Sequence, residues 1–319
     1  MRYRTFGRTG WSVSEIGYGM WGVAGWTGSD DAESLASLAR AAELGANFFD
    51  TAHAYGDGHS ERLLGETLKR HRGARLYVAT KVPPKNEEWP GRAETPVSDV
   101  FPYDHIVAMT HESRKNLGVE RIDLQQLHVW SDAWVHDDGW RRAASDLKRA
   151  GVIEAFGISV NRWEPANVLA ALETGLVDSV QVVYNIFDQA PEDVLFPACQ
   201  RLGVAVIARV PFDEGSLTGA LTLDSRWPEG DWRNSYFSPE RLRETLPRVE
   251  RLKALTDGGS LADLALRFIL HHPAVSTTIA GMRRLPHVQA NLRVSDEPPL
   301  AAERVAALRA HRWDRTRTR

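Results

Sequence analysis

The apolar positions of the chain alternate between the spacing of a helix and that of a buried strand. Residues 31–44 carry alanine and leucine at helical spacing, which predicts an amphipathic helix. Asp30 and Glu33 form the pattern of a capping box before this run, and Gly45 provides a stop after it. The residues that follow, 46–50, predict a short buried strand.

The same alternation continues along the chain. We expect strands at residues 16–20, 46–50, 76–81, 122–128, 152–159, 179–185, 204–210 and 276–280. We expect helices at residues 31–44, about 60–70, about 103–117, 139–149, 164–173, 191–202, 260–271 and about 286–293. Strands interleaved with helices indicate an α/β fold with a parallel sheet, and eight such steps favour closure into a (β/α)8 TIM barrel. A doubly wound open sheet is the alternative that the pattern leaves open.

Two predicted loops are longer than an ordinary connection. Residues 82–101 follow the third strand, and residues 211–238 follow the seventh. Loops of this length are usually functional, and both leave the carboxyl ends of strands, where barrel enzymes carry their active sites. Because no linker divides the sequence, we expect residues 1–319 to form a single domain.

Composition narrows the possible functions. Hydrophobic residues make up 43% of the 319 residues and charged residues 25%, as in ordinary globular proteins. The net charge of -3 includes no basic surplus for nucleic acid or an anionic membrane, and no apolar run approaches the ~20 residues of a membrane helix. A single cysteine, Cys199, permits no internal disulfide, so we expect a cytoplasmic enzyme. The histidine pairs His53 with His59 and His271 with His272 lack further metal ligands, so we expect no metal.

Four polar residues fall at or just after the carboxyl ends of predicted strands. Asp50 ends the second strand and Tyr55 follows it, while Lys81 ends the third strand and His128 the fourth. Taken alone, each residue has a common structural explanation. Asp50 could be a helix cap and Tyr55 a packing ring, Lys81 could extend to solvent, and His128 could be a structural histidine. In a barrel, however, all four would meet at one rim and form an acid–base set. We expect the Lys81 ammonium to lower the pKa of Tyr55, and Asp50 to keep the lysine charged.

Several stretches of the sequence resemble the aldo-keto reductase family. The most specific is Asn-Phe-Phe-Asp-Thr-Ala-His-Ala-Tyr-Gly at 47–56, which continues into Ser-Glu-Arg-Leu-Leu-Gly at 60–65. Weaker likenesses cover essentially the whole chain in order, at residues 7–10, 13–14, 79–81, 123–128, 157–159, 181–185 and 217–219.

The resemblance implies a (β/α)8 barrel that binds NADP(H) and reduces a small aldehyde or ketone. It assigns the family's catalytic tetrad to Asp50, Tyr55, Lys81 and His128. Tyr55 would be the general acid, tuned by Lys81, which Asp50 would hold in place. His128 would orient the carbonyl that receives hydride from the dihydronicotinamide. The sequence leaves the oligomeric state open.

The resemblance also implies a cofactor site. Its expected contacts are Gly19, Met20, Trp21, Asp50, Ser159, Asn161, Gln181, Arg209, Val210, Pro211, Phe212, Leu217, Gly219, Gly281, Arg283, His287 and Asn291. Arg283, next to a helix N-terminus, would suit a 2′-phosphate and so favours NADP over NAD.

The chain departs from the family pattern at three cofactor positions. Val160 is inserted in the usual Gly-x-Ser-Asn motif, and Ala290 stands where glutamate often precedes the last asparagine. Arg209 stands where an aromatic ring commonly stacks on the nicotinamide. An arginine plane can also stack, but its fixed charge would disfavour oxidised nicotinamide.

Tryptophans in the loops at the predicted rim are candidates for a substrate pocket. With Tyr55 and His128, the substrate candidates are Trp21, Trp26, Trp89, Trp130 and Trp134. Such rings would wall a pocket for an apolar or aromatic substrate, or would merely anchor the loops.

Two functions other than carbonyl reduction remain open. A nicotinamide-binding regulatory subunit would keep the fold and the cofactor site while acting on a partner protein. A barrel lyase would use Lys81 as a Schiff-base nucleophile.

Overall fold

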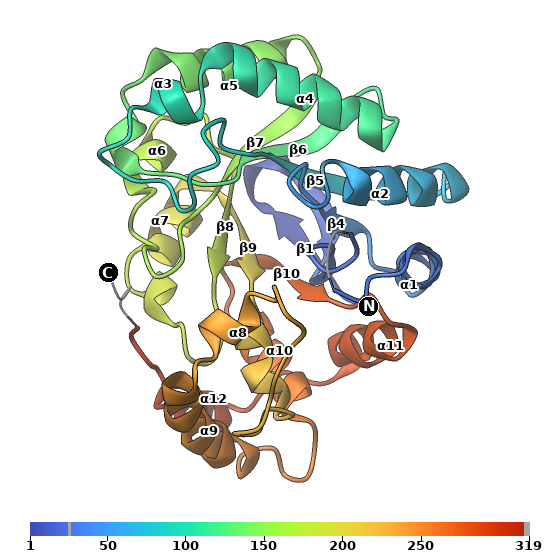
Figure 1. Cartoon of the computed structure of the whole chain (residues 1–319), viewed down its shortest axis with the longest axis vertical. Helices are drawn as coiled ribbons and strands as arrows, with labels where there is room; N and C mark the ends of the chain where they lie inside the picture. Colours follow the sequence, from blue (N-terminus) through green and yellow to red (C-terminus); the bar gives the residue numbers. More distant parts are fainter. Residues whose placement is uncertain (25–26, 316–319) are drawn as a thin grey trace.

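A closed barrel of parallel strands forms the centre of the molecule in the computed structural model, which describes residues 1–24 and 27–315 (Figure 1). The strands run in the order β10-β3-β4-β5-β6-β7-β8-β9. They span Ile16–Gly19 (β3), Phe48–Asp50 (β4), Tyr77–Val82 (β5), Ile122–Leu127 (β6), Ile153–Ser159 (β7), Ser179–Val183 (β8), Ala205–Arg209 (β9) and Val275–Gly281 (β10). Pairing of β10 with β3 closes the barrel, which confirms the predicted fold and excludes the open sheet.

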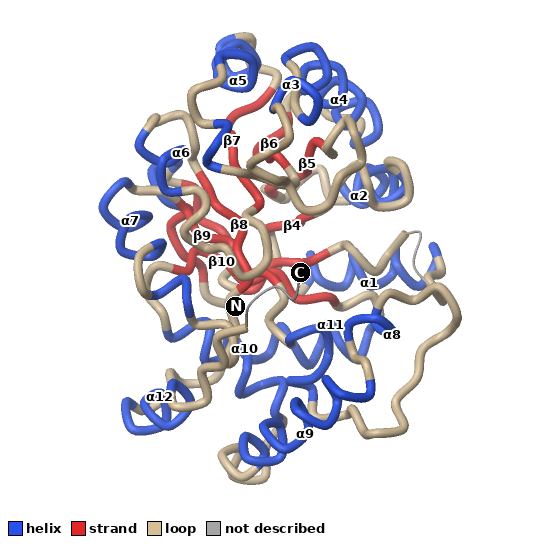
Figure 2. Tube along the Cα trace, turned by 60° about the vertical axis from the view of Figure 1, so that its left-hand side comes forward, coloured by secondary structure: helices blue, strands red, loops and turns tan. Residues whose placement is uncertain are grey.

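Helices surround the barrel (Figure 2). Those at or near the predicted positions are α1 (Asp31–Glu43), α2 (His59–Arg70), α4 (Tyr103–Leu117), α5 (Asp138–Arg149), α6 (Leu169–Glu173), α7 (Leu195–Leu202), α10 (Leu261–His271) and α11 (Leu285–Arg293). The predicted cap of α1 is confirmed, because Asp30 accepts a hydrogen bond of 2.8 Å from the backbone N–H of Glu33.

Two predicted helices are shorter than expected. The helix expected at 164–173 begins only at Leu169, and Trp163 before it has a left-handed backbone with φ of 63°. That conformation is incompatible with a right-handed helix. The helix expected at 191–202 is split into a 3-10 turn, η3 (Ala190–Glu192), and α7.

A hairpin that the pattern did not predict closes the amino-terminal end of the barrel. Its strands are β1 (Tyr3–Phe6) and β2 (Trp11–Ser14). The ring of Phe6 lies 5.3 Å from that of Phe48, and the ring of Trp11 lies 5.1 Å from that of Tyr77. Aromatic side chains therefore fill this end, and the carboxyl end of the strands carries the large cavity described below.

The two long loops are confirmed, and each contains short helical segments: α3 (Val97–Val100) in the first, and η4 (Asp213–Thr218) and α8 (Arg233–Tyr236) in the second.

The remaining elements lie outside these loops. They are η1 (Gly7–Thr9), η2 (Asp132–Trp134), α9 (Pro239–Lys253), η5 (Val294–Asp296) and α12 (Ala302–Arg309). Sequence reasoning missed α9 and α12; Pro247 inside α9 interrupts a pattern that would otherwise predict a helix. Within the described residues, no helix combines the length and the apolar character needed to cross a bilayer.

Candidate active site

The four residues predicted to form an acid–base set meet at the carboxyl end of the barrel. Asp50 ends β4, Lys81 lies near the end of β5, and Tyr55 and His128 follow β4 and β6. The Lys81 ammonium donates hydrogen bonds to Asp50 Oδ1 at 2.6 Å and to the Thr51 carbonyl at 2.8 Å, and it lies 3.4 Å from the Tyr55 hydroxyl. One buried cation thus joins the carboxylate to the phenol.

Two amides hold the other oxygen of Asp50. Gln181 donates to Asp50 Oδ2 at 2.7 Å, and Gln126 donates at 3.2 Å. Gln126, which sequence reasoning missed, is inside the barrel because alternate residues of β6 point inward. Gln181, which was expected to contact the cofactor, commits its amide nitrogen to Asp50 and also lines the cavity described below.

Burial and charge set the protonation of Lys81 and Tyr55. Although burial opposes its charge, Asp50 and Tyr55 raise the pKa of Lys81 above its usual value, so the lysine stays cationic. Burial raises the pKa of Tyr55 above its usual value, and the Lys81 ammonium offsets only part of that effect. The expected lowering of the Tyr55 pKa is therefore wrong in its net direction, and the residue is a neutral phenol at neutral pH.

His128 stands beside Tyr55 as a neutral imidazole. Burial, reinforced by the cations of Lys81 and Arg209, places the pKa of His128 well below its usual value. Its ring centroid lies 5.7 Å from that of Tyr55 and 4.6 Å from that of Trp89, which meets it edge to face. Within the described chain, His128 Nδ1 is buried without a hydrogen-bond partner, so a polar group remains available to a ligand.

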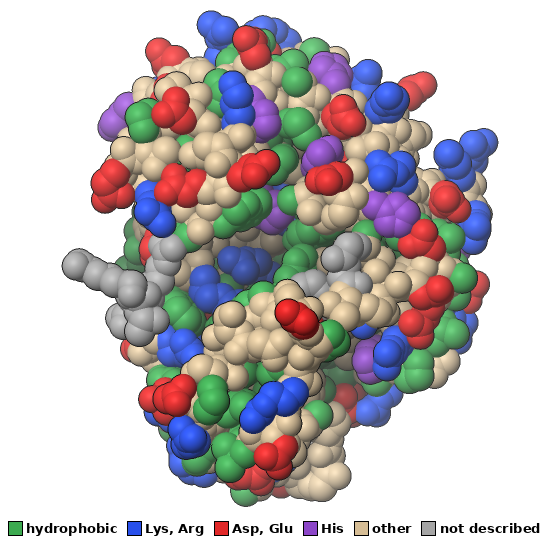
Figure 3. All heavy atoms as spheres, in the orientation of Figure 1, with side chains coloured by type: hydrophobic (Ala, Val, Ile, Leu, Met, Phe, Trp, Pro, Cys, Tyr) green, Lys and Arg blue, Asp and Glu red, His purple; other side chains and the backbone are tan. Residues whose placement is uncertain are grey.

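Asp50, Tyr55 and His128 border a cavity of about 1240 Å³, and the fully buried Lys81 is not part of its lining. The space-filling view shows the molecule hollowed near the middle of the face drawn, with basic side chains in the depth of the hollow (Figure 3). Predicted site residues that line the cavity are Gly19, Met20, Trp21, Asp50, Tyr55, Trp89, His128, Ser159, Asn161, Gln181, Arg209, Val210, Pro211, Phe212, Gly281, Arg283 and His287. Its lining also includes Arg162, Trp232 and Arg284, which sequence reasoning did not single out.

Two tryptophans predicted to touch substrate lie away from the cavity. Trp130 and Trp134 are 0% and 3% exposed and pack with Trp140, whose ring centroid is 5.0 Å from that of Trp130. Trp130 donates to Asp132 and Trp134 to the Thr95 carbonyl, each at 2.9 Å. Satisfied indole groups in an aromatic cluster anchor the loops, so the substrate role predicted for these two residues is wrong. Trp26 lies outside the described residues.

Three predicted cofactor contacts are also absent from the cavity lining. Leu217 is fully buried in the core, Asn291 is 7% exposed within α11, and Gly219 ends η4 facing Lys253 and Leu261. Each residue is close in the chain to residues that line the cavity, but it is itself turned toward the protein interior and not toward the cavity.

Arg209 lies at the mouth of the barrel. Its Nη2 donates to the Val160 carbonyl at 3.0 Å, while its Nε is buried without a partner among the described residues. Burial and repulsion by Arg162 lower the pKa of Arg209 to about 10, so it remains charged at neutral pH. The next residue, Val210, has φ of 58°, an unfavourable conformation for a β-branched side chain that is typical of functional sites.

The far end of the cavity is basic. Arg283 donates to the carbonyls of Gly22 at 3.2 Å and Thr27 at 3.3 Å, so it connects the start of α11 to the segment before α1. Arg284 and His287 line the same end. Burial and the two neighbouring arginines lower the pKa of His287, which favours its neutral form.

The cavity fits an extended nucleotide with anionic groups. Unpartnered polar atoms of His128, Asn161 and Arg209 belong to its lining, and cationic side chains continue to Arg283. Polar atoms that the protein leaves unsatisfied in a deep cavity are expected to bind ligand.

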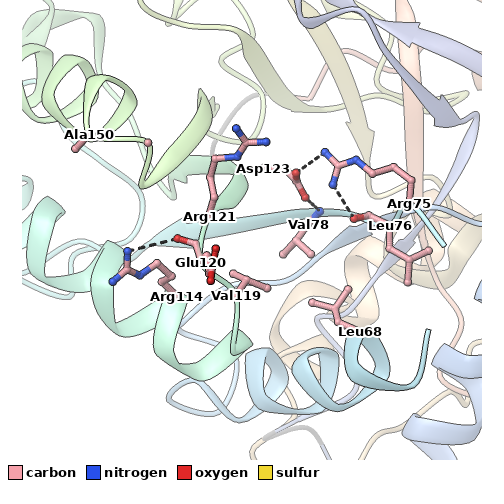
Figure 4. A pocket seen from close by; sticks show the side chains of 11 residues that line it. Leu68, Arg75, Leu76, Val78, Arg114, Val119, Glu120, Arg121, Asp123 and Ala150 are labelled. Carbon is pink, nitrogen blue, oxygen red and sulfur yellow. Dashed lines mark hydrogen bonds and ion pairs between the residues drawn. The ribbon is translucent and has the colours of Figure 1, made fainter. Parts of the chain in front are cut away.

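A second hollow lies at the opposite end of the barrel (Figure 4). Two arginines at this hollow are paired within the protein: Arg75 donates to Asp123 at 2.7 Å, and Arg121 lies 2.6 Å from Glu154. Asp123 also accepts from the backbone of Val78 at 2.9 Å. This hollow therefore reflects structural ion pairs, unlike the cavity around Tyr55.

Comparison with known proteins gives a consistent assignment. The chain is 29% identical over 304 residues to the aldo-keto reductase YhdN of Bacillus subtilis, covering 91% of this chain and 87% of that protein. It is 27% identical over 306 residues to the NADH-specific methylglyoxal reductase of Escherichia coli, covering 92% and 93%. An aldo-keto reductase of Bacillus halodurans in its holo form superposes with a TM-score of 0.79 at 27% identity, covering 99% and 98%. The model of the aldo/keto reductase family matches residues 15–312, and the chain belongs to this family.

Proposed function

We propose that the protein is an NADPH-dependent reductase of aldehydes or ketones in which Tyr55 is the general acid. The observation that carries the proposal is the contact of the buried Lys81 with both Asp50 and Tyr55, two residues that line a cavity large enough for a dinucleotide. The family uses a nicotinamide cofactor, and the choice of NADPH and the roles of individual residues are the proposed part.

The proposed chemistry needs one proton from the protein. When bound, the reduced nicotinamide supplies the hydride that adds to the carbonyl carbon. Tyr55 gives its hydroxyl proton to the carbonyl oxygen, which converts the carbonyl to an alcohol and leaves a phenolate. The Lys81 ammonium, 3.4 Å from the Tyr55 oxygen, stabilises the phenolate until solvent restores the proton of Tyr55.

His128 positions the substrate in this scheme. A neutral imidazole can donate one hydrogen bond to the carbonyl oxygen without adding a charge, and its low pKa keeps it neutral. Trp89 packs edge to face against the ring. Together, Tyr55 and His128 would supply two donors to the oxygen as charge develops on it.

Aromatic side chains near this pair favour an apolar substrate. Trp21 and Trp89 are 42% and 47% exposed and line the cavity with Trp232, whose ring centroid is 5.7 Å from that of Trp21. Exposed indoles in a cavity lose unfavourable contact with water when an apolar group covers them. We therefore expect aromatic aldehydes to be better substrates than short aliphatic ones.

The basic end of the cavity supports the choice of NADPH. Arg283 and Arg284 offer two guanidinium groups at the start of α11, where a helix N-terminus also favours an anion. A 2′-phosphate would gain from both, whereas the hydroxyl of NADH would not.

The direct test is the Tyr55→Phe variant with a panel of aromatic aldehydes and NADPH. We expect kcat to fall by a factor of about 10² to 10⁴, the usual contribution of a general acid, while the NADPH Kd changes by less than about twofold. Absorbance at the reduced-nicotinamide band measures turnover, and quenching of tryptophan fluorescence measures binding. Near wild-type turnover in the variant would refute the role of Tyr55.

Two further outcomes of the same measurements separate the alternatives. Tight NADPH binding without turnover on any carbonyl would favour the regulatory subunit. Trapping of Lys81 by borohydride with a carbonyl substrate, in the absence of nicotinamide, would favour the lyase.

A further inference from the structure

The segment after α12 inserts between the loops that follow β8 and β9. The backbone N–H of Trp313 donates to the Phe187 carbonyl at 2.9 Å, and the two rings meet edge to face with centroids 5.8 Å apart. The guanidinium of Arg248 covers the Trp313 ring at 4.1 Å. Arg315 follows, and only 3% of its side chain is exposed. This segment is therefore packed into the protein.

Arg315 joins the two loops through a pair of buried carboxylates. Its Nη1 lies 2.8 Å from Asp213 Oδ1, and its Nη2 pairs with Asp188 Oδ2. Asp188 belongs to the loop after β8, and Asp213 begins η4 after β9. The side chains of Asp188 and Asp213 are 8% and 1% exposed, so water cannot screen their charges. One guanidinium thus balances two carboxylates that would otherwise repel each other.

Asp213 in turn fixes the backbone of η4. Its Oδ2 accepts from Ser216 at 2.7 Å, and its Oδ1 also accepts from the Tyr236 hydroxyl at 3.0 Å. Asp213 and Glu214 have φ of 44° and 56°, in the left-handed region that non-glycine residues rarely occupy. Such a conformation persists only where the surrounding contacts determine it.

The other side of this loop forms part of the cavity wall. Phe212, Glu214, Gly215 and Thr218 line the cavity, whereas Arg315 and Asp213 do not. Glu214 forms an ion pair with Arg162, a second lining residue. Arg315 therefore acts on the wall from behind, through Asp213.

We propose that Arg315 is a positioning residue for dinucleotide binding. By bridging Asp188 and Asp213, it holds η4 in the conformation that forms the cavity wall. Without this bridge, η4 spends part of its time in other conformations, and the apparent affinity falls in proportion to the competent fraction. The inference rests on the proposed function, because its ligand is the nicotinamide dinucleotide.

The test compares NADPH binding by the full-length wild type with Arg315→Gln and Arg315→Lys. We expect Arg315→Gln to raise the NADPH Kd by about tenfold or more, since two buried carboxylates lose their common cation. Arg315→Lys keeps the charge but lacks the planar fork, so we expect an increase of about threefold to tenfold. With saturating NADPH, kcat should stay within about twofold of wild type, because the Tyr55 proton donor is unchanged.

Arg312→Gln is the matched control. Arg312 lies in the same segment but pairs with Asp193 and Asp314 at the surface, so its loss should leave the Kd within about twofold of wild type. Hydrogen exchange adds a local measurement: amides of residues 213–218 should exchange faster in Arg315→Lys than in wild type.

Two results would overturn the proposal for Arg315. One is a folded Arg315→Lys or Arg315→Gln variant whose NADPH Kd matches wild type. The other is a loss of affinity equal to that of Arg312→Gln. A wild-type chain that binds neither NADPH nor NADH would instead overturn the proposed function, so the two failures are distinguishable.

Discussion

Replacing Lys81 with methionine separates its structural role from its proposed catalytic role. Lys81 is 0% exposed, and methionine fills a similar volume without a charge. The substitution removes the 2.6 Å ion pair with Asp50 and the 3.4 Å contact with Tyr55 in one step. Asp50 then remains buried, and the donors left to its carboxylate among the described residues are the amides of Gln126 and Gln181.

The expected loss of unfolding free energy follows from this burial. Removing one partner of a buried ion pair costs about 3–5 kcal/mol, and two amide donors place this case near 3 kcal/mol. Asp50→Asn should cost a similar amount, because it leaves the Lys81 ammonium buried without its carboxylate. The double variant removes both charges, so we expect it to be about as stable as either single variant, a coupling energy of about 3 kcal/mol.

Denaturant unfolding of the four proteins measures the coupling, and turnover measures the chemistry. All three variants should lose kcat by about a hundredfold or more, since none retains an ammonium held beside Tyr55. Lys148→Met is the matched control: Lys148 pairs with Asp178 away from the cavity, so kcat should not change. Recovery of turnover in the double variant would show that the Lys81 charge is dispensable, and a Lys81→Met cost below about 1 kcal/mol would refute the electrostatic reasoning.

The remaining predictions concern the cofactor and pH. Arg283→Ala should raise the NADPH Kd by about tenfold and the NADH Kd by less than about twofold, because a charge-assisted contact to phosphate is lost; equal effects in fluorescence titrations would remove the 2′-phosphate assignment. Since the pKa of His128 is well below its usual value, kcat/KM should show no inflection from this residue near pH 6.5. The same shift means that the unfolded chain binds the additional proton, so the unfolding free energy should fall as pH drops below about 6.5. His128→Gln should reduce this slope, and an unchanged slope would contradict the assigned protonation of His128.

Local patterns predicted the barrel well. Buried parallel strands appear as short apolar runs, and the helix after Asp30 has both its cap and its stop in adjacent residues. The elements that were missed lack such signals: α9 contains Pro247, and the hairpin of β1 and β2 is short and mixes polar with apolar residues. The tetrad was predictable because strand ends in a barrel converge on one rim, whatever the rest of the packing.

Side-chain direction in loops was not predictable in the same way. Trp89 and Trp130 were equal candidates in the sequence, yet one borders the cavity and the other packs against Trp140. A loop has no fixed periodicity, so its residue spacing does not define a face. The bridge from Arg315 to Asp213 and Asp188 spans more than a hundred residues and leaves no local trace in the sequence.

The protonation of Tyr55 also depends on burial, which the sequence does not define. A lysine beside a phenol stabilises phenolate, but enclosure of the same phenol disfavours any charge, and here enclosure is the stronger effect. The stronger effect of burial on the pKa of Tyr55 suits the proposed reduction. A phenol that had already lost its proton could not protonate the carbonyl oxygen, whereas a neutral phenol beside a fixed ammonium can donate and then be stabilised as phenolate. In the proposed mechanism, Lys81 would therefore contribute most after the proton has left Tyr55, in the phenolate state that this proton transfer creates.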